Sequence, residues 1–490
     1  MFPQTDNTYL CVRPNHSPIR SFAANISLAV LLNLLIKPAW LLVEMVVQDR
    51  VGHADWGLYA ALLSLGFLLV ALADLGMSPY LTRTLAAHPE AYGRIVPQLL
   101  TLKLFLLVLY PCVGILAGFV TGYRGEALGL LAMLCLVHAG GQMLQFFRAG
   151  LQARQAFKAD SLLSVSDRIV LMGIVGVLLM GGIDIMAFGY ARLAAAVLTA
   201  LIAYRMLTRT WGALPVRWPT EGRDLLRQGL PFAWMTVLYS LHDKVDQVML
   251  ERIAGEVENG LYAAAYRWLD ALSMYLWTVL PLFFARFARI PDQIDEQARL
   301  LRFGQVITAL PILILCAWGW FYGDTLLLIF GHSTPEEKVI MLACLQALLA
   351  ALALNGVFAI FSTLLTSTGH ERYVSRLIVG SILLNTGLNL WLIPRWGAVG
   401  SAWATVASYA AMDIAYVIYI RYALSLKLPW GQMIRLGLIG VWVWLIAWGC
   451  QVLNWPWWAA GGLIAAGGGA AAWSLGLLSP AYLRFFRHEG

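Results

Sequence analysis

Residues 98–121 read QLLTLKLFLLVLYPCVGILAGFVT, an apolar block whose one charged side chain is Lys103. A helix of about 20 such residues is long enough to cross the hydrocarbon core of a bilayer. Blocks of this kind recur along the 490 residues, separated by short polar stretches. The chain is 60% hydrophobic and 12% charged, whereas soluble domains carry about 25% charged residues. The sequence therefore predicts an integral membrane protein and excludes a soluble enzyme.

The apolar blocks predict an all-α, polytopic membrane protein with about 14 transmembrane helices. The expected spans are 20–46, 55–77, 98–121, 127–147, 161–181, 184–204, 229–251, 259–285, 303–322, 338–365, 377–393, 398–420, 436–453 and 457–477. The first block is too long for the apolar region of a signal peptide, so we expect it to remain as the first span.

Lys and Arg are distributed unevenly over the connections between these spans. When the N-terminus is placed in the cytoplasm, the outside connections hold only Arg50, Arg124, Arg252, Lys338 and Arg395, and the inside connections hold far more. Cytoplasmic loops are enriched in this way, so both termini are predicted to be cytoplasmic. Membrane topology accounts for the net charge of +7, and we expect no nucleic-acid partner.

The sequence GLYAA occurs at residues 57–61 and again at residues 260–264, an offset of 203. Six expected spans lie within this offset, and an even number preserves the orientation of a repeat in the membrane. The repeat predicts two pseudo-symmetric six-helix lobes plus two extra C-terminal helices. The N-lobe covers residues 1–206, a cytoplasmic linker covers 207–228, and the C-lobe covers 229–425. Residues 426–490 hold the last two spans and a cytoplasmic tail.

Several charged side chains fall inside the expected spans, where a charge at the bilayer centre costs roughly 2.5–3.5 kcal/mol. Lys103 lies near a cytoplasmic end, and we expect its ammonium group to extend outward to the interface. The deeper cations are Lys37, Arg168, Arg192, Lys244 and Arg267. Since they come from both predicted lobes, we expect them to line a central cavity for an anionic group. The alternative explanation, for some of these cations, is that they form ion pairs with buried acids.

Polar and aromatic side chains at helical spacing extend the candidate site. They are Tyr262, Tyr266 and Asp270 in one span, Gln142 and Gln145 in another, and Asn385 and Asn389 in a third. Such groups suit a sugar phosphate, because amides bind hydroxyl groups, rings stack on sugar faces and cations pair with phosphate oxygens. The alternative role of the amides is to hold membrane helices together.

Three acidic side chains, Glu44, Asp243 and Asp246, are candidates for binding a coupling ion, either Na⁺ or H⁺. The chain has no P-loop and no other catalytic motif that we could identify. The six cysteines are scattered and form no Cys/His cluster. We therefore expect no catalytic residue, no metal site and no cofactor, and transport driven by a gradient or by the substrate.

Three segments resemble a known family. They are ADLGMS at 73–78 with Arg83, ENGLYAAAYR at 258–267, and LIPRWGAVGSA at 392–402, which follows Asn385 and Asn389. Together they resemble the bacterial polysaccharide transporters, the Wzx-type flippases of lipid-linked oligosaccharides. That family belongs to the multidrug/oligosaccharidyl-lipid/polysaccharide (MOP) exporter superfamily.

The resemblance implies a V-shaped pair of lobes in the bacterial inner membrane. By alternating access, such a protein flips a polyprenyl-diphosphate-linked glycan from the cytoplasmic to the periplasmic leaflet. The expected partners are the lipid-linked glycan, the bilayer, and glycan polymerases and glycosyltransferases, and we expect a monomer. The last two spans would offer a groove for the polyprenyl tail, as in the related lipid II flippases.

Two other functions remain open at this point. A multidrug or cation antiporter of the same fold would need a cavity dominated by acids. A membrane glycan polymerase or ligase would need a long external loop, which the sequence lacks.

Overall fold

The computed structural model describes residues 18–154, 156–212, 217–220, 222–290, 293–423 and 428–478. The N-terminal residues 1–17, parts of the expected linker and the tail from residue 479 lie outside the described residues. Within the described ranges every regular element is a helix. The predicted all-α membrane fold is confirmed.

The first half of the chain forms α1 to α8. Their bounds are α1 (Pro18–Val51), α2 (His53–Leu68), α3 (Ala71–Asp74), α4 (Met77–Ala87), α5 (Tyr92–Val120), α6 (Glu126–Ala153), α7 (Phe157–Gly181) and α8 (Ile185–Trp211). The second half forms α9 (Gly222–Ala254), α10 (Glu256–Phe287), α11 (Ile294–Leu326), α12 (Pro335–Ser367), α13 (Glu371–Ala423), α14 (Trp430–Val452) and α15 (Trp457–Ser474).

The expected spans all fall on helices, and the helices depart from the expected one-per-span pattern at two places. By length and composition alone, nine of the described helices could cross a membrane, or up to ten with the bent pair that α2 forms with α3 and α4. The second expected span is this bent pair, with an angle of 44°. α13 holds both the eleventh and the twelfth span. Its backbone breaks between the two spans at Gly397, where φ is 54°.

The bend after α2 lies between Leu68 and Ala71, and a second break follows between α3 and α4. Leu75 and Gly76 adopt left-handed conformations, with φ of 44° and 74°, and α4 then begins at Met77. The Asp74 carboxylate accepts hydrogen bonds from the Ser78 backbone amide (3.2 Å) and hydroxyl (2.6 Å), which caps the start of α4. Lys103 pairs with the same carboxylate and is 0% exposed. The expectation that Lys103 extends to the interface is wrong, because the half-buried Asp74 provides a partner for the buried ammonium group.

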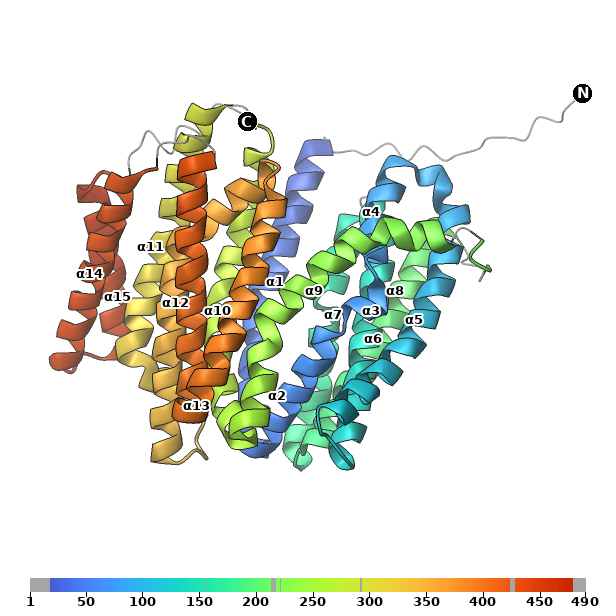
Figure 1. Cartoon of the computed structure of the whole chain (residues 1–490), viewed down its shortest axis with the longest axis horizontal. Coiled ribbons are helices and arrows are strands. Elements are labelled where there is room, and N and C mark those ends of the chain that lie inside the picture. Colours follow the sequence, from blue (N-terminus) through green and yellow to red (C-terminus); the bar gives the residue numbers. More distant parts are fainter. Residues whose placement is uncertain are drawn as a thin grey trace, which may run out of the picture.

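The helices form two groups that converge toward one end of the molecule (Figure 1). One group contains α2 to α8, and the other contains α10 to α13 with α14 and α15 beside it. α1 and α9 run between the groups: α1 packs against α7 and α10, and α9 packs against α2 and α13. The first helix of each half therefore contacts the other half.

The repeated GLYAA segments lie face to face where the two groups converge. A Cβ atom on Gly57 would lie 1.8 Å from the Glu256 carbonyl oxygen, and one on Gly260 would lie 2.0 Å from the His53 carbonyl oxygen. The offset of 203 residues relates Gly57 to Gly260 and His53 to Glu256, so the two contacts are equivalent. In addition, the Asn259 side chain donates to the Gly57 carbonyl (2.7 Å). The repeat thus forms a pseudo-symmetric contact between α2 and α10 that only glycine permits.

An alanine at Gly57 or Gly260 is expected to lower the free energy of unfolding by about 1–3 kcal/mol, because the added methyl group must push two backbones apart. Thermal unfolding of the purified protein in detergent measures the change. Gly129→Ala is the matched control, since a Cβ atom there meets nothing within 4 Å. Equal melting temperatures for Gly57→Ala and Gly129→Ala would contradict the expectation.

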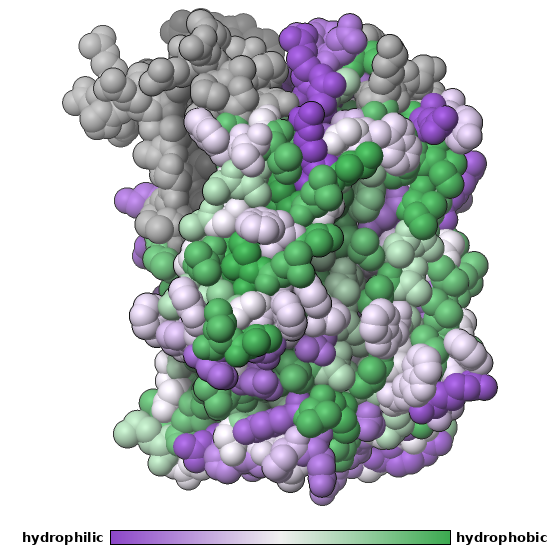
Figure 2. All heavy atoms as spheres, turned by 90° about the vertical axis from the view of Figure 1, so that its left-hand side faces the viewer, coloured by the Kyte–Doolittle hydropathy of each residue, from purple (hydrophilic) through white to green (hydrophobic). Residues whose placement is uncertain are grey.

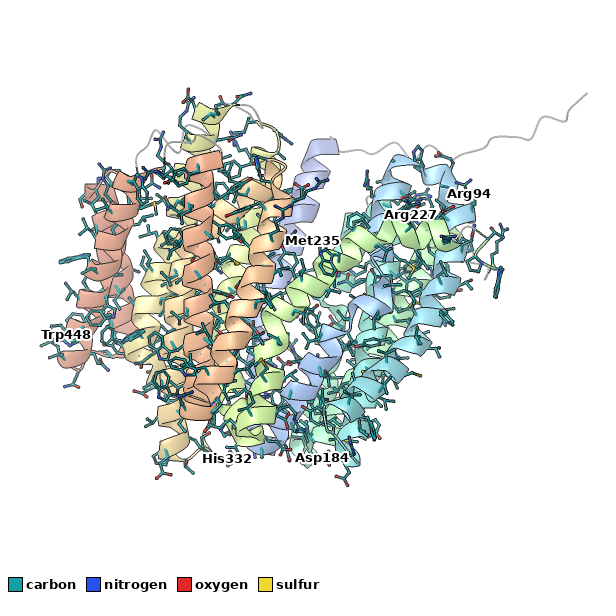
Figure 3. The ribbon with its side chains drawn as sticks, in the orientation of Figure 1. Arg94, Asp184, Arg227, Met235, His332 and Trp448 are labelled. Atoms are coloured by element: carbon teal, nitrogen blue, oxygen red, sulfur yellow. The ribbon has the colours of Figure 1, made fainter. Side chains whose placement is uncertain are left out.

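The ends and the flank of the molecule differ in polarity as a membrane protein requires. Arg94 and Arg227 lie at one end, and Asp184 and His332 lie at the other (Figure 3). On the face that carries α14 and α15, hydrophobic side chains spread over the middle and hydrophilic ones gather along the lower rim (Figure 2). The chain is a multi-pass membrane protein.

Candidate functional site

A cavity of about 250 Å³ lies among α6, α7 and α8, and we call it the N-lobe cavity. Its polar lining consists of His138, Gln142, Gln145, Arg148, Ser164, Asp167, Arg168, Arg192 and Thr199. The four residues from α6 are spaced by four, three and three positions, which places them on one face of the helix. The lining contains three arginines and one carboxylate, so this cavity is suited to an anion.

The cations of the N-lobe cavity have incomplete pairing. Arg168 lies 3.3 Å from the carboxylate of its neighbour Asp167, and its side chain is 33% exposed. Arg148 pairs with Asp160 at 2.7 Å. The Lys37 ammonium group interacts electrostatically with Arg168, Arg148 and Asp167. The guanidinium group of Arg168 therefore has hydrogen-bond donors available for a ligand.

One buried carboxylate joins the two lobes. Glu44 of α1 is 3% exposed, and it lies 3.3 Å from Arg192 of α8 and 3.4 Å from Arg267 of α10. Arg192 also donates to the Tyr59 hydroxyl at 2.5 Å, and Arg267 lies 3.8 Å from Asp270. We call Glu44, Arg192 and Arg267 the lobe junction. At this junction a single carboxylate holds a guanidinium group from each lobe.

A second cavity, of about 470 Å³, lies in the other lobe among α9, α10, α12 and α13, and we call it the C-lobe cavity. Its polar and aromatic lining consists of Thr236, Tyr239, Ser240, His242, Asp243, Tyr266, Asp270, Ser273, Trp277, Asn355 and Tyr409. Figure 3 labels Met235, which also lines it. The described lining residues include two carboxylates and neither Lys nor Arg. Phe67 of α2 lines both cavities, so they adjoin at this ring.

Hydrogen bonds hold the polar groups of the C-lobe cavity in place. The Asp243 carboxylate accepts from the Tyr266 hydroxyl (3.1 Å) and pairs with Lys244 (3.0 Å). The Lys244 ammonium group lies 4.7 Å from the centre of the Tyr266 ring. The His242 ring stacks on Tyr409 with centroids 5.9 Å apart. These contacts fix the direction of the acidic and aromatic groups before a ligand arrives.

The structure places the predicted site residues in three groups. Gln142, Gln145, Arg168 and Arg192 line the N-lobe cavity, and Tyr266, Asp270 and Asp243 line the C-lobe cavity. Glu44 and Arg267 form the junction with Arg192, while Lys37 and Lys244 lie beside the cavities. The expected single cationic cavity is corrected to two adjoining cavities of different polarity, because acids accompany the buried cations of the second lobe.

Four further predicted residues belong to none of these groups. The Tyr262 hydroxyl donates to the Asp246 carboxylate at 2.6 Å, and Asn389 donates to Asn385 at 2.8 Å within α13. All four side chains are buried. The Tyr262–Asp246 contact joins α10 to α9, and the Asn389–Asn385 contact lies within α13.

Several lining residues were missed in the sequence. Arg148 lies one residue beyond the expected span 127–147, yet it continues the α6 stripe three positions after Gln145. Tyr239 and His242 share a face of α9 with Asp243, which helical spacing alone indicates. Asn355 has no comparable signal, since the residues three and four positions before and after it are apolar. Tyr409 was missed although Thr405 and Asp413 share its face of α13.

The fold is that of MOP-superfamily transporters. The lipid II flippase MurJ in an inward closed conformation aligns with a TM-score of 0.73 at 11% identity, over 92% of this chain and 98% of MurJ. A multidrug resistance MATE transporter in an inward-facing conformation aligns with a TM-score of 0.65 at 16% identity, over 82% and 98% of the two chains. A MOP transporter from Pyrococcus furiosus, described as having a binding pocket of reverse polarity, aligns with a TM-score of 0.60 at 15% identity, over 83% and 96%.

The sequence itself identifies the family. Residues 22–286 match the family model described as polysaccharide biosynthesis protein, and the chain belongs to this family. An uncharacterized membrane protein of Methanocaldococcus jannaschii is 22% identical over 197 residues, which cover 40% of this chain. The match spans 46% of that relative's length.

Proposed function

We propose that the protein is a flippase that moves a polyprenyl-diphosphate-linked oligosaccharide from the cytoplasmic to the periplasmic leaflet of a bacterial inner membrane. The observation that carries the proposal is the N-lobe cavity, in which Arg148, Arg168 and Arg192 face a single lining carboxylate. A diphosphate cannot cross hydrocarbon without compensation for its charge. Guanidinium groups bind phosphate oxygens with paired, charge-assisted hydrogen bonds, so this cavity supplies the compensation that the head group needs.

The way the lobes meet supports alternating access. Their mutual hydrogen bonds include those from Asn259 to Gly57, from Gln48 to Gly260 (2.8 Å) and between His53 and Ser333 (2.7 Å). These contacts lie toward the end of the molecule that carries His332, where the groups of helices converge (Figures 1 and 3). With both chain termini cytoplasmic, as the loop charges predict, this is the periplasmic end. The cavities are then reached from the cytoplasm.

The lobe junction provides a way to couple substrate binding to the motion of the lobes. Arg192 and Arg267 each pair with a different carboxylate oxygen of Glu44, and a diphosphate that pairs with Arg192 replaces the carboxylate as its partner. The link from α8 through Glu44 to α10 is then interrupted, and the Glu44–Arg267 pair remains as the contact of this junction between the lobes. The weaker junction favours rocking of the lobes, which moves the opening to the other side.

The lipid tail can remain in the bilayer along α14 and α15. An apolar groove on these helices, of about 510 Å³, is lined by Leu438, Ile439, Trp442, Gly467 and further small or apolar residues. The coupling ion is proposed to bind at an acid of the C-lobe. Asp246 is favoured over Asp243 and Glu44, because it is buried and forms no ion pair with the described residues, whereas the other two have cationic partners.

Reconstitution tests the function directly. Proteoliposomes are loaded with a labelled polyprenyl-diphosphate oligosaccharide, and its transfer between leaflets is followed with a membrane-impermeant glycan-modifying reagent. We expect the transfer to depend on the protein and to require no ATP. The glycan should be chemically unchanged afterwards. A modified glycan product would indicate a polymerase or ligase instead.

The C-lobe cavity supports a second candidate, a multidrug or cation antiporter. Asp243 and Asp270 face this cavity together with several aromatic rings, a lining that also suits an organic cation. Drug resistance on expression, without complementation of a strain that lacks a glycan flippase, would favour this function over the first.

A further inference from the structure

The C-lobe cavity has a chemistry that a diphosphate does not use. Its described lining has two carboxylates, several hydroxyl groups, one amide and a set of aromatic rings, without Lys or Arg. We propose that this cavity is a glycan subsite for an uncharged sugar, and that it rejects a sugar that carries a carboxylate. The inference rests on the proposed function and defines the class of glycan that the flippase takes.

The size and the rings of the cavity suit a sugar unit. Its volume of about 470 Å³ lies within the range of roughly 300–1,000 Å³ found for small-molecule sites. Tyr239 and Trp277 line it and are 53% and 58% exposed, so their faces are available for contact. Tyr409 is held against His242 by stacking. Flat aromatic faces pack against the C–H surfaces of sugar rings, and this contact does not depend on charge.

The acids of the cavity select for hydroxyl donors. A carboxylate has about four acceptor positions and no hydrogen to donate. Asp243 uses some of these positions for Tyr266 and Lys244, and its side chain is still 43% exposed. Sugar hydroxyls can donate to the remaining positions of Asp243 and Asp270. A sugar carboxylate has no hydrogen to donate and brings a like charge, so it is repelled.

The nearby cations do not reverse this selection. Lys244 lies beside Asp243, and Arg267 lies between Glu44 and Asp270. Each is bound to an acid of the protein, and neither lines the cavity. Because both cations are bound to acids, they hold the two carboxylates in place, and both carboxylates still line the cavity as acceptors for sugar hydroxyls.

The positions of the two cavities match the order of groups in the substrate. Phe67 is a common wall of both cavities, so a ligand that fills the N-lobe cavity ends next to the C-lobe cavity. In a lipid-linked glycan the sugars are attached directly to the diphosphate. A diphosphate held by Arg168 and Arg192 therefore directs the attached sugars toward Asp243 and Asp270.

The test compares two probes on the full chain, purified in detergent. One is a polyprenyl diphosphate that carries a disaccharide of neutral hexoses, and the other has a uronic acid in place of one hexose. We expect the neutral probe to bind about tenfold tighter or more. In the double variant Asp243→Asn, Asp270→Asn the ratio should fall below about threefold, because the like-charge repulsion is removed. Asp324→Asn, at an exposed position outside both cavities, should keep the wild-type ratio.

Each outcome decides between the two proposals. Equal binding of both probes by the wild type overturns the glycan subsite and leaves the flippase function standing. Absence of binding for both probes overturns the proposed function. A wild-type ratio retained in the double variant overturns the assignment to these carboxylates. If the double variant does not fold, the wild-type ratio and the single variant Asp270→Asn still decide the matter.

Discussion

Replacing Glu44 with glutamine is expected to abolish flipping and to lower the free energy of unfolding by about 3–5 kcal/mol. Glu44 is the one carboxylate that Arg192 and Arg267 share, at 3.3 and 3.4 Å. Glutamine keeps the shape and the acceptor oxygen but removes the charge, so two largely buried guanidinium groups from opposite lobes would lose their common partner. Chemical denaturation of the purified protein measures the stability, and the proteoliposome assay measures flipping.

Asp49→Asn is the control on the same helix. Asp49 pairs with His332 at 2.6 Å at the exposed end of α1, and exposed pairs contribute about 0–1 kcal/mol. A double-mutant cycle adds a further check: Glu44→Gln combined with Arg267→Gln should cost less than the sum of the single changes, because the second change removes an uncompensated charge. Full additivity, or a Glu44→Gln protein as stable as the wild type, would refute the shared-carboxylate model.

Replacing Arg168 with glutamine is expected to reduce flipping about tenfold or more while the melting temperature stays unchanged. Hydrogen bonds to charged groups contribute roughly 1.5–3 kcal/mol, and 1.4 kcal/mol corresponds to a factor of ten. The Arg168 side chain is one-third exposed and contacts only its neighbour Asp167 among the described carboxylates. Its loss should therefore cost the folded state little and the bound diphosphate much.

Two variants control for this result. Arg168→Lys keeps the charge without the paired donors and should retain an intermediate rate. Arg395→Gln removes an exposed arginine whose hydrogen bond is to the Trp391 carbonyl oxygen, and it should flip at the wild-type rate. If Arg168→Gln complements a flippase-deficient strain fully, the N-lobe cavity is not the diphosphate site.

The sequence alone determined the membrane class, the course of the spans and the repeat. Apolar blocks long enough to cross a bilayer allow only helices, since each backbone group must find its partner within its own segment. The two GLYAA copies predicted that Gly57 and Gly260 have equivalent positions in two lobes. In the structure these two glycines make equivalent close contacts with the opposite helix. These features depend on residues that are close in the sequence or that recur at a fixed spacing, so they can be recognised without the three-dimensional structure.

Only the tertiary structure decided how the charges are shared. The offset of 203 relates Glu44 to Gln247 and Ser64 to Arg267, and in the fold Ser64 donates to Gln247 at 2.9 Å while Glu44 pairs with Arg267. Nothing in the spacing of single residues says that Arg192 joins the same carboxylate, or that Asp243 and Asp270 face a cavity separate from Arg168. A buried charge is positioned by whichever opposite charge the packing brings within reach, and that choice depends on helices far apart in the chain.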